Sequence, residues 1–242
     1  MITARRVAGW SVHFYTALGA VAAVFALLAI ARGEIGLAML LLALAVAIDA
    51  SDGALARLAR VKEVVPEYDG AKLDDIVDYL TFVVVPIYLM LETGMLVGVF
   101  GYAAGAAAVL ASAYRFCHED AKTSDHFFTG FPSYWNIIAY YFYVFETSPG
   151  WSAFWTGVLA VLVFAPLRFV YPTRTVFLRP WTIGLGLIWG AMTLMTLAAL
   201  PERRTTLAAV SLFYPAYYTL LSFYMQWRGY GSSGPPKAEA TR

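Results

Sequence analysis

Cysteine and charged side chains are both scarce in this sequence. Cys117 is the only cysteine among 242 residues, which excludes an internal disulfide and a metal site built from several cysteines. Aspartate, glutamate, lysine and arginine together make up 14% of the chain, whereas soluble domains carry about 25%. The net charge of +1 says nothing about nucleic acid, and we expect no nucleic-acid partner. A soluble globular class is therefore a poor fit to the composition.

Hydrophobic residues make up 60% of the chain and the mean hydropathy is +0.65, which indicates a protein embedded in lipid. A membrane-spanning helix needs about 20 residues, so the length allows one membrane domain of about eight spans. We predict an all-α integral membrane protein, a bundle of transmembrane helices that forms a single domain over residues 1–230. The helices are expected at residues 11–31, 36–61, 71–92, 95–117, 132–147, 151–171, 181–200 and 205–227.

The two ends of the chain differ from its apolar middle. Two arginines precede the first apolar run, which we expect to be a retained span and not a cleaved signal peptide. Residues 231–242, GSSGPPKAEATR, are polar and rich in small residues and proline, so we expect a disordered tail. The chain has 17 lysines and arginines. If the N-terminus lies in the cytoplasm, the predicted spans place only three of them on the opposite side of the membrane, namely Arg32, Arg203 and Arg204. This bias predicts that both termini are cytoplasmic.

Six aspartates lie between residues 49 and 78, in a stretch that interrupts the apolar sequence. Asp49 and Asp52 are three residues apart on one predicted helix, and Asp74 and Asp78 are four apart on the next, so each pair shares a helix face. An aspartate at the bilayer centre costs about 2.5–3.5 kcal/mol, and like charges repel. We therefore predict that the four carboxylates hold divalent cations in a water-filled cavity near one membrane surface.

A polar loop is the alternative interpretation of this acidic stretch. Its carboxylates would then be solvated or paired with nearby basic residues, namely Arg57, Arg60, Lys62 and Lys72. The helical spacing of the two pairs and the residues around them favour the metal site. Intramembrane carboxylates would also suit a divalent-cation transporter, although such sites usually lie near the membrane midplane on broken helices.

Small residues next to the first aspartate pair predict a binding surface for a nucleotide. Gly53 and Ala56 leave one helix face bare, so that a large ligand can approach the backbone closely. Arg57 can bind a phosphate with its forked guanidinium or pair with an aspartate. Gly70 stands just before the second acidic pair. Packing between helices is the alternative for the small residues, because such faces are common in membrane proteins.

The pattern DxxDGxxAR, followed after a spacer by GxxxDxxxD, resembles the signature of the CDP-alcohol phosphotransferases. Its eight fixed positions are Asp49, Asp52, Gly53, Ala56, Arg57, Gly70, Asp74 and Asp78. The spacer, residues 58–69, is longer than is usual in that family and contains Pro66, but the spacing within each half is intact. The long spacer, the run DAKTSDHFFTGFPSYWN at 120–136 and the start SVHFYTALGA resemble the bacterial phosphatidylcholine synthases within this family.

The resemblance implies an enzyme that transfers the phosphatidyl group of CDP-diacylglycerol to choline, giving phosphatidylcholine and CMP. It implies that the four aspartates hold two divalent cations, Mn²⁺ or Mg²⁺, and that Asp78 also takes the proton from the choline hydroxyl. Gly53, Ala56, Arg57 and Gly70 would contact the nucleotide. The resemblance further implies a homodimer in the bacterial inner membrane, surrounded by membrane lipids, and the basic residues predict that its active site opens to the cytoplasm.

Choline carries a quaternary ammonium group, which aromatic faces and carboxylates bind because it has no N–H to donate. Candidate choline-binding residues on the predicted cytoplasmic side are Tyr79, Phe82, Tyr134 and Trp135. Core packing or a place in the interfacial aromatic belt is the alternative for each. Three acids and several aromatic residues lie between residues 116 and 135. This composition favours choline over the acceptors of the alternatives within the family, the phosphatidylserine, phosphatidylglycerol phosphate and phosphatidylinositol phosphate synthases.

Overall fold

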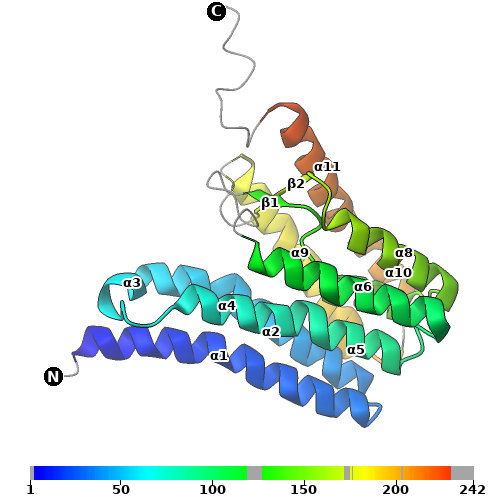
Figure 1. Cartoon of the computed structure of the whole chain (residues 1–242), viewed down its shortest axis with the longest axis horizontal. Coiled ribbons are helices and arrows are strands. Elements are labelled where there is room, and N and C mark those ends of the chain that lie inside the picture. Colours follow the sequence, from blue (N-terminus) through cyan, green and yellow to red (C-terminus); the bar gives the residue numbers. More distant parts are fainter. Residues whose placement is uncertain (1–2, 119–126, 172–174, 176, 203, 230–242) are drawn as a thin grey trace, which may run out of the picture.

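The computed structural model describes residues 3–118, 127–171, 175, 177–202 and 204–229, and nearly all of its regular structure is helical (Figure 1). Two long helices, α1 (Ala4–Ala31) and α2 (Ile35–Leu58), begin the chain and pack along each other. The other elements are α3 (Val61–Val64), α4 (Gly70–Asp78), the π-helix η1 (Tyr79–Val84), α5 (Val85–Glu92), α6 (Gly98–Cys117), β1 (Phe127–Thr129), α7 (Trp135–Val144), α8 (Pro149–Leu162), β2 (Arg168–Val170), α9 (Arg179–Ala198), α10 (Thr205–Ser211) and α11 (Phe213–Trp227).

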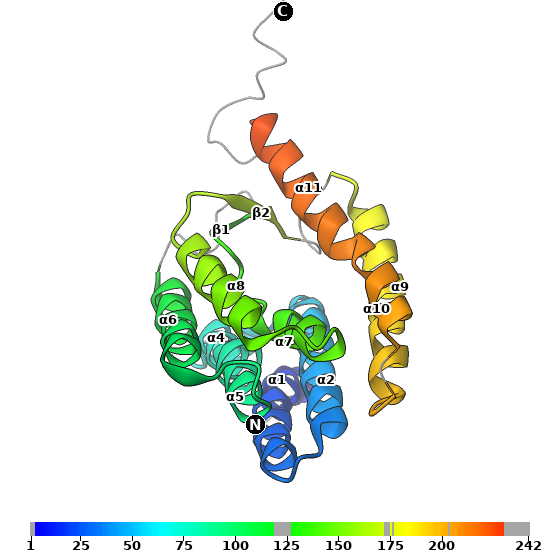
Figure 2. The same ribbon diagram turned by 90° about the vertical axis from the view of Figure 1, so that its right-hand side faces the viewer.

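The helices form two groups in space (Figure 2). Helices α1 to α8 pack as one bundle, in which α6 lies against α8 and α5 against α7. Helices α9, α10 and α11 stand to one side, where α9 contacts α2 and α10 contacts α7. The apolar core lies inside the bundle, and its fully buried side chains come mainly from η1, α5 and α7, such as Val83, Met90 and Val144.

The apolar helices confirm the predicted class, a helical multi-pass membrane protein. Among the described residues, five helical segments are long and apolar enough to cross a bilayer: α1, α2, α6, α9 and residues 205–227. Large apolar side chains point outward from them, including Phe14, Phe100 and Trp227, as contact with lipid tails requires. Helices α7 and α8 contain 10 and 14 residues, fewer than the about 20 of a regular span. The number of eight crossings stays a prediction.

The predicted helix over residues 71–92 is continuous, but its middle is wider than an α-helix. α4 leads directly into η1, and η1 leads into α5. Pro86 lies in the first turn of α5. It has no backbone N–H, so the carbonyl of Phe82, four residues earlier, lacks its α-helical partner. Such π-turns are often found next to functional residues, and this one begins immediately after Asp78.

The predicted helix over residues 151–171 was wrong in its second half. α8 ends at Leu162, and residues 168–170 form β2, which pairs antiparallel with β1. Pro166 cannot continue a helix and restricts the residue before it. Side chains of α11 replace the lost helical hydrogen bonds, since the Val170 N–H donates to Ser222 Oγ and the Arg168 N–H to Gln226 Oε1, each at 3.1 Å.

Two glycines allow α4 to lie unusually close to α1. A Cβ atom at Gly19 of α1 would lie 2.6 Å from Cγ1 of Val77, and one at Gly70 of α4 would lie 2.5 Å from Cε1 of His13. Both distances are too short for real atoms, so any larger residue would push the helices apart. His13 is buried, and its ring packs against Gly70 and Tyr68. These contacts fix where α4 presents its aspartates.

Some sequence-based predictions fall outside the described residues. The expected tail at residues 231–242 is among them. So are the three acids that favoured a cationic acceptor, Glu119, Asp120 and Asp125. These predictions stay as they were made.

We predict that Gly19→Ala lowers the melting temperature of the purified protein, because the added methyl group must displace Val77. Overpacking of this kind costs about 1–3 kcal/mol, which exceeds the gain in helix propensity of up to about 1 kcal/mol. The matched control is Gly157→Ala on α8, where no atom lies within 4 Å of the new Cβ position, and its melting temperature should stay the same or rise. Thermal unfolding in detergent measures both, and equal stability of Gly19→Ala and wild type would contradict the expected clash.

Candidate functional site

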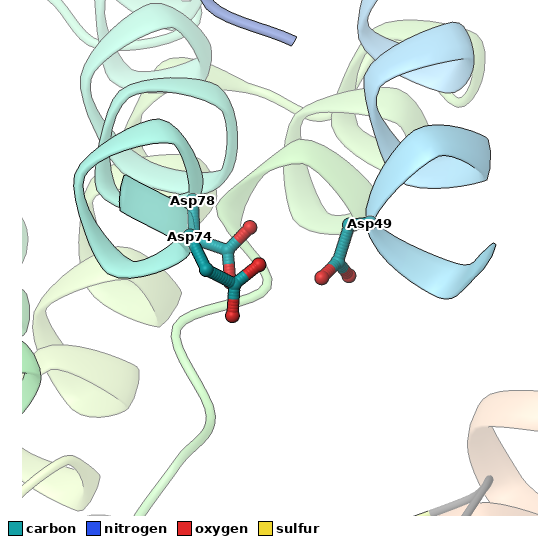
Figure 3. Close-up of side chains that lie close together, drawn as sticks. All are labelled: Asp49, Asp74 and Asp78. Carbon is teal, nitrogen blue, oxygen red and sulfur yellow. The ribbon is translucent and has the colours of Figure 1, made fainter. Parts of the chain in front are cut away.

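Three aspartates meet between α2 and α4 (Figure 3). One carboxylate oxygen from each of Asp49, Asp74 and Asp78 lies within 4.8 Å of the other two, and all three residues are partly exposed. Asp49 comes from α2, whereas Asp74 and Asp78 lie one turn apart on α4. The structure therefore brings together three of the four aspartates named from the sequence, and it does so from two different helices.

The start of α4 sets the direction in which its aspartates point. Asp69 precedes the helix, and its Oδ1 accepts hydrogen bonds from the N–H groups of Ala71 and Lys72, each at 3.1 Å. This is a regular N-cap, which satisfies donors that the first turn leaves without partners. Because the cap fixes where the helix begins, it also fixes the rotational positions of Asp74 and Asp78.

Asp52 lies apart from this group and has its own partner. It follows Asp49 by one turn of α2 but is only 7% exposed. Its Oδ2 accepts a hydrogen bond of 2.8 Å from Oγ1 of Thr16 on α1. Asp52 is therefore anchored to a helix that carries none of the other named aspartates.

The chemistry of the cluster fits a divalent cation. Carboxylate oxygens are the ligands that hard cations such as Mg²⁺ and Mn²⁺ prefer. Three carboxylates with oxygens within 4.8 Å of one another would repel strongly in a partly buried place, where the effective dielectric constant is lower than in water. A bound cation would offset this repulsion, so the cluster formed by Asp49, Asp74 and Asp78 is able to hold a metal ion.

Comparison with known proteins identifies the family. Residues 12–167, which are more than half of the chain and include α2 and α4, match the sequence profile of the CDP-alcohol phosphatidyltransferases. The chain belongs to this family.

Curated members of the CDP-alcohol phosphatidyltransferase family resemble the chain over most of its length. It is 41% identical to the phosphatidylcholine synthase of Legionella pneumophila over 224 residues, which cover 90% of this chain and 88% of that protein. It is 39% identical to the phosphatidylcholine synthase of Legionella bozemanae, with 83% and 96% covered. The phosphatidylcholine synthase of Bradyrhizobium diazoefficiens is also 39% identical, with 80% and 73% covered.

The glycine and arginine of the first half of the family signature lie next to each other. Gly53, Ala56 and Arg57 follow Asp52 on α2. A Cβ atom at Gly53 would lie 3.4 Å from Nη1 of Arg57, so the guanidinium group lies over the bare glycine. Arg57 is exposed near the end of α2. A positive group beside an open backbone suits a phosphate-bearing ligand, but a nucleotide at this place stays a prediction.

Gly70, in the second half of the signature, has a visible packing role. The imidazole ring of His13 fills the space where its side chain would be. Tyr68 packs on the same ring, with 4.6 Å between centroids. These contacts explain a glycine here without a nucleotide, and the predicted nucleotide contact of Gly70 is untested.

Three of the four candidate choline-binding residues are held in packing contacts. Trp135 is fully buried, and its Nε1 donates to Ser112 Oγ at 2.9 Å. The Tyr79 hydroxyl donates to the backbone carbonyl of Val109 at 3.1 Å. Phe82 is buried in the core. These positions favour the core-packing alternative for all three, while their role toward choline stays an untested prediction.

Tyr134 differs from these three because it lies near Asp49 of the cluster. Its ring lies 6.0 Å from that of Phe82, on η1 just after Asp78, and 6.3 Å from that of Tyr218 on α11. The Asp49 carboxylate lies near enough to act electrostatically on the Tyr134 phenol.

Several residues that shape the site were not named as site residues from the sequence. Thr16 and Tyr218 lie far along the chain from the acidic stretch, and the family signature includes neither residue. Ser133 adopts a left-handed conformation (φ 58°) and accepts a hydrogen bond of 2.9 Å from Ser112. Ser112 also accepts from Trp135, so it holds both neighbours of Tyr134 in place. Only the folded chain brings these side chains together.

We predict that Asp49→Asn, Asp74→Asn and Asp78→Asn each weaken Mn²⁺ binding by more than about tenfold. Even residues that only orient a metal ligand contribute about 10–100-fold to the metal affinity. Asp75→Asn is the matched control, because Asp75 lies on the same helix outside the cluster. Electron paramagnetic resonance of free Mn²⁺, titrated with purified protein, gives the dissociation constants. An unchanged constant for all three cluster variants would exclude this metal site.

Proposed function

We propose that this chain is a phosphatidylcholine synthase, which transfers the phosphatidyl group of CDP-diacylglycerol to the hydroxyl group of choline and releases CMP. The observation that carries this proposal is the 31–41% identity to proteins of that name over most of the chain. The aspartate cluster supports it, because phosphoryl transfer from a pyrophosphate needs concentrated positive charge at the reacting oxygens. Family membership disfavours the divalent-cation transporter.

The four aspartates are assigned to two divalent cations, Mg²⁺ or Mn²⁺. When bound, such ions polarise phosphoryl oxygens and stabilise the charge that develops on the leaving phosphate. The protein's part is to hold the ligands in place. Asp49, Asp74 and Asp78 converge from two helices, and Asp52 supplies a fourth carboxylate whose orientation Thr16 fixes.

Asp78 is assigned the role of general base. In the reaction the choline oxygen forms a bond to the phosphorus that carries diacylglycerol, and the bond from this phosphorus to the CMP oxygen breaks. The choline hydroxyl must lose its proton, and we assign a carboxylate of the cluster to accept it. Asp78 is the residue from which the helix widens into η1, so its carboxylate lies where the backbone departs from regular geometry. A positioned base contributes about 10²–10⁴-fold to the rate.

Gly53, Ala56, Arg57 and Gly70 are assigned to the nucleotide end of CDP-diacylglycerol. The exposed guanidinium of Arg57 beside Gly53 offers two parallel N–H donors to a phosphate. The bare backbone at Gly53 lets the ligand approach α2 closely.

Tyr134 is the aromatic residue that we retain for choline. A quaternary ammonium group is attracted to an aromatic face and to negative charge, and Tyr134 lies next to Asp49 and Phe82. An enzyme whose acceptor is an anionic alcohol would instead need arginines in its acceptor pocket. The ring of Tyr134 contacts those of Phe82 and Tyr218, and Asp49 acts on its phenol.

The remaining proposals concern the setting of the enzyme. We infer a bacterial inner-membrane protein with both termini and the active site in the cytoplasm, because the link between the two helices of the cluster contains Arg60 and Lys62 and such basic residues mark the cytoplasmic side. A homodimer is also proposed, on family resemblance alone.

We predict that the purified protein, given CDP-diacylglycerol and Mn²⁺ or Mg²⁺, releases CMP with choline and not with serine, glycerol 3-phosphate or inositol phosphate. Excess chelator should abolish the reaction. Asp78→Asn should release CMP at least about 100-fold more slowly, as loss of a general base requires. If serine or glycerol 3-phosphate supports turnover while choline does not, the acceptor is wrong although the family remains.

We predict that Tyr134→Leu raises the KM for choline by about 5–30-fold, which corresponds to a cation–π interaction of about 1–2 kcal/mol. Tyr134→Phe keeps the ring, so its KM should stay within about threefold of the wild-type value. The KM for CDP-diacylglycerol should change little in either variant. Steady-state CMP release measures these constants, and a wild-type KM for choline in Tyr134→Leu would remove this residue from the choline site.

A further inference from the structure

The hydrogen bond of Thr16 differs from those that five other threonines make. A buried threonine hydroxyl in a helix commonly donates to the backbone carbonyl four residues earlier. The structure shows this bond, at 2.6–3.1 Å, for Thr81, Thr93, Thr182, Thr196 and Thr219. Thr16 instead donates across to α2, to Oδ2 of Asp52 at 2.8 Å.

The surroundings make this bond a strong constraint on the carboxylate. Thr16 and Asp52 are each only 7% exposed, so little water reaches the pair. A hydrogen bond to an ionised acceptor is about twice as strong as one between neutral groups. A buried carboxylate whose donor is removed is left with a large desolvation penalty. The orientation of the Asp52 side chain therefore depends on Thr16.

We propose that Thr16 is a positioning residue, whose hydroxyl group holds the Asp52 carboxylate in the orientation that binds a divalent cation. The inference rests on the proposed function, because it takes Asp52 as a metal ligand. The Thr16 hydroxyl donates to one carboxylate oxygen of Asp52, Oδ2, so the other oxygen, Oδ1, can bind the ion. Partners of this kind orient the ligand and are worth about 10–100-fold in metal affinity.

A neighbouring hydrogen bond between the same two helices provides a matched control. The Tyr15 hydroxyl and Ser51 Oγ lie 2.9 Å apart, with the same separation of 36 residues as Thr16 and Asp52. Ser51 also donates to the carbonyl of Ala47, so it keeps a partner when Tyr15 is changed. Tyr15→Phe therefore removes an α1–α2 contact without touching a carboxylate.

The test compares Thr16→Val, Thr16→Ser and Tyr15→Phe by Mn²⁺ titration of the purified protein. Thr16→Val keeps the shape and loses the donor, so its Mn²⁺ dissociation constant should rise about tenfold. Thr16→Ser keeps the donor and should stay within about twofold, as should Tyr15→Phe. The Mn²⁺ concentration for half-maximal activity should shift in parallel, with a smaller change in kcat. If Thr16→Val does not fold, Thr16→Ala takes its place.

A second measurement separates positioning from helix packing. In an Asp52→Asn background, Thr16→Val should change Mn²⁺ affinity by less than about twofold, because residues that act through one group are not additive. Wild-type affinity in Thr16→Val, or an equal loss in Tyr15→Phe, would overturn the inference. If Asp52→Asn itself binds Mn²⁺ like wild type while the cluster variants do not, the inference fails and the metal site stands. If none of the four aspartates affects binding, the proposed function fails with it.

Discussion

The close packing of α1 against α2 and α4 is the constraint on which the candidate site depends. Carboxylates that repel one another converge only if the backbone holds them there. Gly19 on α1 admits Val77 of α4, and Gly70 admits His13 of α1. The other long contact of α1 is with α2, which carries Asp49. Helix α1, which carries no cluster aspartate, thus determines the distance between α2 and α4, which carry all three.

Buried polar groups in this protein join helices at the points where the site needs precision. Thr16 links α1 to Asp52 on α2, and Ser112 on α6 holds Ser133 and Trp135 on either side of Tyr134. In a lipid-facing bundle such groups find no water as a substitute partner, so each bond restricts a helix pair to one arrangement. The apolar contacts stabilise the bundle, whereas these few bonds orient the side chains that face the cluster.

The helical periodicity of the sequence predicted most of the fold and the convergence of three aspartates. Spacings of three and four residues require a shared face wherever the helix runs, and Asp74 and Asp78 follow this rule. The spacing of Asp49 and Asp52 does not reveal that one side chain is partly exposed and the other buried against Thr16. Strand β2 was also missed, because its three residues, Arg168–Val170, follow an apolar run and were read as the end of a span, and its partner strand lies about 40 residues earlier.

The long spacer between the two halves of the signature, residues 58–69, is part of the same packing arrangement. Val65 is fully buried against Gly9, where a Cβ atom would lie 2.8 Å from it. Tyr68 packs on the ring of His13, and Glu67 pairs with Arg6 at the start of α1. The spacer therefore packs against α1. Because this connection is anchored on α1, its extra residues do not change how α2 is positioned against α4. The longer spacer is therefore compatible with an aspartate cluster formed by the two halves of the signature.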